Sequence, residues 1–145
     1  MKTSIAIVLA ILLATACKPK PKPIQYGLES CDYCRMTIVD TQHAAEAVTD
    51  KGKAYVFDAI ECMIQFKAGH ADKDFALLLI NDYAEAGTLK DATQATYLIS
   101  SQVPSPMGAF LSGFSNPQDA EKMRAAKGGD LYSWAEIEKK ISTTK

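Results

Sequence analysis

The sequence predicts an α+β protein of two small, related units, each made of strands and one helix, followed by a C-terminal helix. Apolar segments of strand length alternate with amphipathic segments of helix length, and the helical segments carry recognisable start and stop residues. The second half of the chain repeats the outline of the first. With 145 residues, 48% of them apolar, the chain can bury a packed core.

Residues 1–16 have the pattern of a bacterial lipoprotein signal peptide. Lys2 supplies a positive charge, and residues 5–13 form an apolar segment too short to be a mature membrane span. Small residues then precede Cys17, as in a lipobox, which predicts cleavage before Cys17 and lipidation of its thiol. The alternative is an ordinary secretory signal cut after Ala16, which leaves a free thiol. Either signal places the mature protein outside the cytoplasm.

Residues 17–25 are predicted to form a lipid-anchored linker, because lysine and proline alternate from Lys18 to Pro23. This pattern favours an extended polyproline II conformation and excludes helix. Lys18 occupies the place where inner-membrane retention typically has an acidic residue, which favours the outer membrane. We therefore expect a domain of residues 26–145 that faces the periplasm on a stiff cationic tether.

The first unit, about residues 26–85, is predicted to contain strands at 36–40 and 44–49 and a return strand at 53–57, with Gly52 in the turn between the last two. A helix follows that ends at Gly69, and Asp58 with Glu61 resembles a capping box at its start. The continuous apolar run at 75–80 predicts a buried strand.

The second unit, about residues 86–145, is predicted to have strands at 95–100 and 109–114, joined by a proline-containing loop at 103–108. Asn116 and Pro117 are typical of a helix start, and Gly128 follows the helix end. Ser133 then begins a final helix, with Glu136 completing a capping box.

The chemistry of the chain is concentrated in the segment Cys31-Asp-Tyr-Cys34-Arg-Met36. Thiolate and thioether are soft donors, and they suit Cu(I). If this segment is extended, the two-residue period of a strand points the sulfurs of Cys34 and Met36 to the same side. The segment is then a two-sulfur clip for Cu(I).

Two further side chains are candidate ligands. Met107 lies between Pro106 and Gly108 in the loop, where a packing role is less natural than on a helix. It is either a third sulfur donor or core filler. His43 is either a nitrogen ligand or a solvated turn residue.

Cysteine counting leaves several alternatives open. Without Cys17, three cysteines remain, and an odd number cannot pair completely within one chain. Cys31 forms a disulfide with Cys34 or Cys62, or it is an auxiliary ligand. A thioredoxin-like role for the CxxC pair would require a helix start at that position, and a zinc site would require a second pair of ligands.

Other function classes find little support. The net charge of −1 gives no reason to expect a nucleic-acid partner. The sequence contains no phosphate-binding loop, nucleophile elbow or dinucleotide fingerprint, so we expect a protein that is not an enzyme.

Four segments together resemble the NosL family, lipoproteins accessory to nitrous oxide reductase, an enzyme of denitrification. The resemblance covers about residues 26–141 and rests on the segments at 31–36, 52–58, 105–108 and 128–129. Family members often have glycine where this chain has Arg35, which adds charge and bulk beside the site.

The resemblance implies two units of ββαβ type and a copper chaperone. It implies a Cu(I) site at Cys34, Met36 and Met107, with Cys31 and His43 as further candidates. The implied partners are nitrous oxide reductase, whose copper–sulfur centre would receive the metal, and its copper-site maturation and ABC-type transport complex. The alternative function is a periplasmic thiol–disulfide oxidoreductase that uses Cys31 and Cys34, and a structural lipoprotein that binds no metal is a third candidate.

Overall fold

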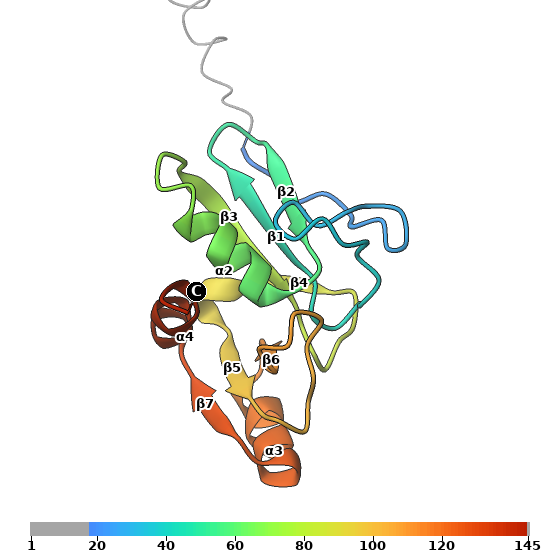
Figure 1. Cartoon of the computed structure of the whole chain (residues 1–145), viewed down its shortest axis with the longest axis vertical. Coiled ribbons are helices and arrows are strands. Elements are labelled where there is room, and N and C mark those ends of the chain that lie inside the picture. The colour runs from blue at the N-terminus through green and yellow to red at the C-terminus, as the bar shows by residue number, and fades with distance from the viewer. Residues whose placement is uncertain (1–17, 145) are drawn as a thin grey trace, which may run out of the picture.

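The computed structural model describes residues 18–144, in which two antiparallel sheets lie one beyond the other (Figure 1). The predicted signal peptide and Cys17 lie outside the described residues. Among residues 18–144, no helix is both long and apolar enough to cross a membrane.

The first unit has four strands in the order β2-β1-β3-β4, all paired antiparallel. Helix α2 connects β2 to β3, and a 3₁₀ turn, η2, follows β4. The bounds are β1 Ala45–Thr49, β2 Ala54–Phe57, α2 Ile60–Ala68, β3 Phe75–Asn81, β4 Leu89–Asp91 and η2 Ala92–Gln94.

The second unit repeats this plan, with its first strand again in the centre of a sheet ordered β6-β5-β7. Helix α3 connects β6 to β7, and α4 follows at the C-terminal end. The bounds are β5 Thr96–Ile99, β6 Leu111–Phe114, α3 Pro117–Lys127, β7 Asp130–Tyr132 and α4 Trp134–Ser142. Both units therefore contain a ββαβ arrangement, to which the first unit adds β4, and a final helix follows, which confirms the predicted α+β fold class.

Helix α2 joins the two units. It packs against β1 and β2 of the first sheet, β6 of the second sheet, and α4. One core cluster accordingly runs through both units and includes Ile60 and Met63 of α2, Ile80 of β3 and Tyr97 of β5, all fully buried. A smaller cluster around Leu98 and Phe114 is covered by α3. The start of α2 therefore lies where the two units meet.

The predicted helix signals of the second unit are confirmed. The Asn116 side chain accepts a hydrogen bond from the Gln118 N–H, and Pro117 occupies the first helical position of α3. The reciprocal capping box between Ser133 and Glu136 starts α4. Gly128 and Gly129 end α3 with φ angles of 70° and 98°, in the left-handed region that glycine tolerates best.

The predicted strand at 36–40 is wrong. Only an isolated bridge between Ser30 and Thr37 forms there, because Arg35 has a φ of 68° and turns the chain back on itself. Cys34 therefore lies in a turn, and the two-residue alternation expected for Cys34 and Met36 does not apply. The strand at 75–80 is confirmed, but only Ile80 and Asn81 of β3 are fully buried. The three-residue strands β4 and β7 were not predicted, since they are too short to produce a pattern.

The predicted capping role of Asp58 is also wrong. The residue before α2 is Ala59, which makes no side-chain capping bond. Asp58 and Glu61 are both buried and bind other partners, described below. Their spacing resembles a capping box only in the sequence.

The end of the linker contacts the folded domain. The Lys22 N–H donates to Glu46 Oε1 at 2.9 Å, the Lys22 ammonium pairs with Glu29, and Ile24 is buried. Only the residues before Lys22 are therefore available as a free tether within the described chain.

Gly129 provides a test of the packing between α3 and the second sheet. A β-carbon at this position would lie 2.1 Å from the Ile99 carbonyl oxygen, and its φ of 98° is strained for other residues. We expect Gly129→Ala to lower the free energy of unfolding by about 2 kcal/mol or more. Urea denaturation followed by circular dichroism measures this change.

Gly69→Ala is the matched control. Its β-carbon would meet only backbone oxygens at 3.6 and 3.7 Å, which is ordinary contact. We expect this variant to be as stable as the wild type or up to about 1 kcal/mol more stable. Equal losses in both variants would contradict the packing argument.

Candidate metal centre

Residues 31–36, here called the sulfur loop, form a tight turn closed by backbone hydrogen bonds. The Cys31 N–H donates to the Met36 carbonyl at 2.8 Å, and the Arg35 N–H donates to the Cys31 carbonyl at 3.0 Å. The Cys34 N–H points at the Cys31 sulfur, 3.5 Å away. The loop therefore holds both thiols on its inner side without belonging to a helix or a sheet.

Asp32 attaches the sulfur loop to the first sheet. Its N–H donates to the Val56 carbonyl at 2.8 Å, and its Oδ2 accepts from the Val56 N–H at 2.8 Å. The residue thus pairs with β2 as a neighbouring strand would. Because β2 leads directly into α2, this pairing places the loop beside Asp58 and the first turn of the helix.

Four side chains meet at this point and form what we call the thiol cluster: Cys31, Cys34, Asp58 and Cys62. Their sulfur and oxygen ligand atoms all lie within 4.8 Å of one another. The Cys34 thiol donates to Asp58 Oδ1 at 3.3 Å. Cys31, Asp58 and Cys62 are buried, whereas Cys34 is partly exposed. Three sulfurs and one carboxylate at this spacing are a donor set for a thiophilic metal.

Hydrogen bonds within the cluster distribute its protons unevenly. The pKa of Cys31 is lowered to about 6, chiefly because the Cys62 thiol donates to its sulfur, and backbone N–H groups add to the effect. Donating that bond, together with burial, raises the pKa of Cys62. The pKa of Cys34 is raised to about 11, mainly by burial. Of the three thiols, that of Cys31 is therefore the most easily deprotonated.

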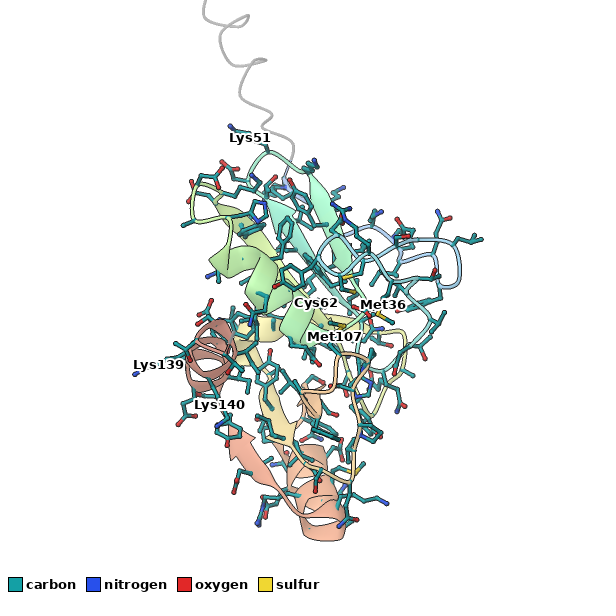
Figure 2. The ribbon with its side chains drawn as sticks, in the orientation of Figure 1. Met36, Lys51, Cys62, Met107, Lys139 and Lys140 are labelled. Carbon is teal, nitrogen blue, oxygen red and sulfur yellow. The ribbon has the colours of Figure 1, made fainter. Side chains whose placement is uncertain are left out.

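Met36 and Met107 lie at the surface beside the cluster, with 53% and 41% of their area exposed. Figure 2 places both at the end of α2 that carries Cys62. The loop of Met107 is attached to α2 through Glu61, whose Oε1 accepts from the Ser105 hydroxyl at 2.6 Å and from the Ala109 N–H at 3.4 Å. Glu61 therefore positions the methionine loop.

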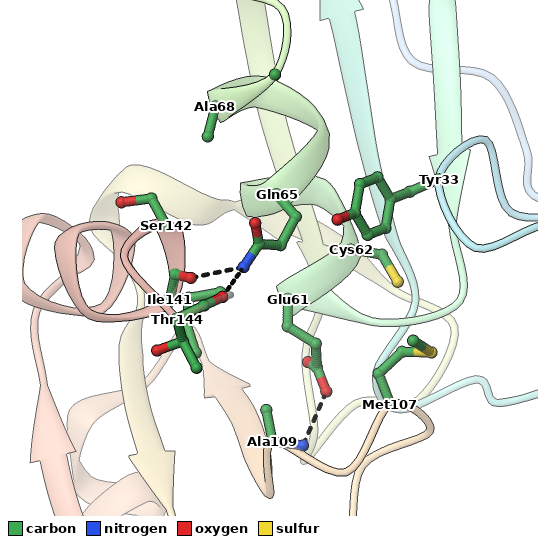
Figure 3. A pocket seen from close by; sticks show the side chains of 11 residues that line it. Tyr33, Glu61, Cys62, Gln65, Ala68, Met107, Ala109, Ile141, Ser142 and Thr144 are labelled. Atoms are coloured by element: carbon green, nitrogen blue, oxygen red, sulfur yellow. Dashed lines mark hydrogen bonds between the residues drawn. The ribbon is translucent and has the colours of Figure 1, made fainter.

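A hollow of about 800 Å³ opens between α2, α4 and this loop (Figure 3). Tyr33, Glu61, Cys62 and Met107 line one part of it, and residues of α4 line another. Gln65 closes the upper side by donating to the carbonyls of Ile141 and Thr144. Burial raises the pKa of Glu61, whose Oε2 has no hydrogen-bond partner among the described residues. The hollow gives access to Met107 from outside, and its wall includes Cys62, whose own surface is only 1% exposed.

His43 is not part of the thiol cluster. Its Nδ1 lies 2.9 Å from Asp40 Oδ2 and its Nε2 lies 3.1 Å from the Ser112 hydroxyl, so both ring nitrogens have partners. The histidine and Ser112 are both buried, which leaves no room for a substrate at that hydroxyl. These hydrogen bonds connect the two units, and a substrate cannot reach the buried imidazole.

The structure thus brings Cys31 and Cys34 together, with Met36 and Met107 beside them. It adds Cys62 and Asp58, which the sequence analysis did not include in the site. Cys62 stands alone in the sequence, and ligand patterns are recognised by pairs. The only feature of the sequence that pointed to a role for Cys62 was the odd number of cysteines left after Cys17.

Comparison with known proteins agrees with this fold. The sequence profile of the NosL family matches residues 24–142. A relative, the copper-binding lipoprotein NosL of Stutzerimonas stutzeri, is 28% identical over an alignment of 152 positions that covers 92% of this chain and 80% of that protein. The crystal structure of the copper chaperone NosL from Shewanella denitrificans superposes with a TM-score of 0.68 at 23% identity, covering 81% of this chain and 97% of that one.

The left-handed conformation of Arg35 generates a stability prediction. A non-glycine residue pays about 1–2 kcal/mol to adopt it. We therefore expect Arg35→Gly to raise the free energy of unfolding by about 1 kcal/mol, measured by chemical denaturation. Arg35→Ala is the control, because it removes the charge and keeps the strain. An equal gain in stability in both variants would mean that the arginine side chain, and not the strained backbone, lowers the stability of the wild type.

The burial pattern predicts which thiol reacts first. Of Cys31, Cys34 and Cys62 in the reduced, metal-free protein, iodoacetamide should modify Cys34 alone, since the other two are buried. Because the pKa of Cys34 is raised to about 11, the rate should increase about tenfold per pH unit between about pH 7 and pH 10. Peptide mass spectrometry identifies the modified site. Earlier modification of Cys31 or Cys62 would contradict the arrangement.

Proposed function

This chain belongs to the NosL family, and on that premise we propose that it is a Cu(I) carrier that delivers copper for assembly of the copper–sulfur centre of nitrous oxide reductase. The observation that carries the proposal is the convergence of three cysteine sulfurs within 4.8 Å, with the exposed Met36 and Met107 near Cys62 in Figure 2. Soft sulfur donors favour Cu(I) over harder cations. The proposed role is transport and not catalysis.

Cys34 is the proposed thiolate ligand, and Met36 and Met107 are the proposed thioethers. Cys34 is the one cysteine of the cluster that is not fully buried, and it is two residues from Met36. Copper would replace the proton of this thiol, which is released to solvent, in spite of the raised pKa, since a coordinated thiol is deprotonated. Cys31 is an auxiliary ligand in this proposal. His43 would join the site only by breaking its bonds to Asp40 and Ser112.

The exposure of the methionines supports delivery over storage. Copper held partly by side chains that are 53% and 41% exposed remains accessible to ligands of another protein. A low coordination number leaves one side open for ligand exchange. The proposed recipients are nitrous oxide reductase and its copper-site maturation and ABC-type transport complex. The proposed location is the periplasmic side of the cell envelope, with an anchor on Cys17 in the outer membrane.

The alternative function, thiol–disulfide exchange by Cys31 and Cys34, draws support from their proximity. Two features weigh against it. The pair lies in a loop and not at a helix start, and Cys31 is completely buried. This function requires Cys31 and is indifferent to both methionines, so the two functions predict opposite results in a variant series.

The test is an anaerobic Cu(I) titration of the mature chain against a competing chelator. We expect one copper per chain. Cys34→Ser should weaken binding at least about a hundredfold, and Met36→Leu or Met107→Leu should each weaken it about tenfold, equivalent to ~1.4 kcal/mol. Each substitution removes a donor atom and keeps the side chain similar in size.

Met123→Leu is the matched control, because Met123 packs on α3 in the second unit, away from the thiol cluster. Its affinity should equal that of the wild type. Two results together would replace the carrier proposal with the oxidoreductase. Copper binding would be weak and unchanged by both methionine substitutions, and Cys31→Ser would abolish disulfide exchange activity.

A further inference from the structure

The exposed apolar side chains of this protein are not scattered. Among residues 18–144, six large apolar side chains are exposed, and all of them lie in the segment 28–39 or in the loop between β5 and β6. We call them the apolar rim: Leu28, Tyr33, Met36, Val39, Met107 and Phe110. Single exposed apolar residues are normal, but their concentration in one region marks an interaction site.

The two segments of the rim adjoin each other in space. Tyr33 of the first and Met107 of the second line the same hollow, on either side of Cys62. Within the first segment, backbone hydrogen bonds join Gly27 and Glu29 to Ile38, which brings Leu28 close to Val39. Tyr33 and Met107 therefore border the hollow, and the segments that carry the other rim residues continue from them.

Backbone strain falls in the same region. The non-glycine residues with positive φ among the described residues are Arg35, at 68°, and Phe110, at 56°. Phe110 belongs to the rim, and Arg35 stands between Cys34 and Met36. Strained positions persist where the surrounding structure enforces them, and they cluster at functional sites. Here they hold a guanidinium and an aromatic ring at the surface beside the cluster.

Arg35 has no carboxylate partner among residues 18–144. The acidic side chains closest to it in the sequence have other partners: Glu29 pairs with Lys22, Asp32 with Val56, and Asp40 with His43. An unpaired arginine within an apolar surface is typical of a protein interface, where it meets a carboxylate of the partner. A second copy of this chain fits poorly, because a twofold contact would bring two Arg35 side chains to one interface without a free carboxylate.

We infer that the apolar rim and Arg35 form the docking surface for the protein that receives the metal, a partner with an apolar face and a carboxylate placed to pair with Arg35. The inference rests on the proposed carrier function. The hollow between Tyr33 and Met107 accepts an anchoring side chain of that partner, which then lies beside Cys62. Docking on this surface covers the thiol cluster and brings the partner's ligands to the metal.

The test measures docking separately from copper binding. Copper-free nitrous oxide reductase and its ABC-type maturation complex are immobilised in separate channels, and the mature chain is added in its copper-free and Cu(I)-loaded forms. The variants are Arg35→Glu, Val39→Ser and Phe110→Asn, none of which is a proposed ligand. Asparagine tolerates the positive φ of residue 110. Lys139→Glu on α4, away from the rim in Figure 2, is the charge-reversal control.

We expect wild type to bind at least one recipient, and Arg35→Glu and Phe110→Asn each to weaken binding at least tenfold, with a smaller loss for Val39→Ser. Lys139→Glu should stay within twofold of wild type. In the chelator titration, Val39→Ser and Phe110→Asn should hold Cu(I) as tightly as wild type. Circular dichroism and thermal melting verify that each variant is folded.

Unchanged docking in all three rim variants would overturn the inference, as would the absence of binding of the wild type to both recipients. Sedimentation that reveals a dimer dissociated by the rim substitutions would also overturn it, by assigning the surface to a second copy. If the copper-free chain docks through the rim but neither the wild type nor any variant binds Cu(I), the docking surface stands and the carrier function falls.

Discussion

The paired hydrogen bonds between Asp32 and Val56 determine where the sulfur atoms lie. The sulfur loop has no regular secondary structure, so its own backbone bonds fix its shape but not its place in the molecule. Asp32 supplies that place by completing the edge of β2 with both its N–H and its carboxylate. Since β2 runs directly into α2, Cys31 and Cys34 come to face Asp58 and Cys62. Removing one partner would leave a buried backbone group unsatisfied, which is costly.

A second attachment brings in the other unit. Glu61, next to Cys62 on α2, accepts hydrogen bonds from Ser105 and Ala109 and so holds the loop of Met107 against the same helix. The first turn of α2 therefore organises donors from three places in the chain. The two units share a ββαβ arrangement, but the proposed site belongs to neither alone, so copper binding there would depend on the packing between the units.

The balance between buried and exposed sulfur suits a carrier. Cys31 and Cys62 lie inside and share a hydrogen bond, whereas Cys34 and the two methionines lead outward to the surface. A fully buried site would retain the metal, and a fully exposed one would compete poorly with other soft donors. The strained residues Arg35 and Phe110 and the exposed apolar side chains lie on the outward side. The strained backbone and the exposed apolar side chains lower the stability of the fold on this side, which is the side that we propose a recipient contacts.

The sequence alone determined the fold class, most element bounds, and the caps of α3 and α4, because periodicity and capping are local properties. It also led to the proposal of Cys34 as a copper ligand, since soft-donor chemistry can be read from the residues themselves. It misplaced a strand at 36–40, since β-branched residues do not form a strand without a neighbouring strand to pair with. It took Asp58 and Glu61 for helix caps, because their spacing is the same whether they bind the helix or other partners. Only the tertiary structure brought Cys62 and Asp58 to the sulfur loop, since that meeting depends on the Asp32–Val56 pairing, and long-range pairing leaves no mark on local patterns.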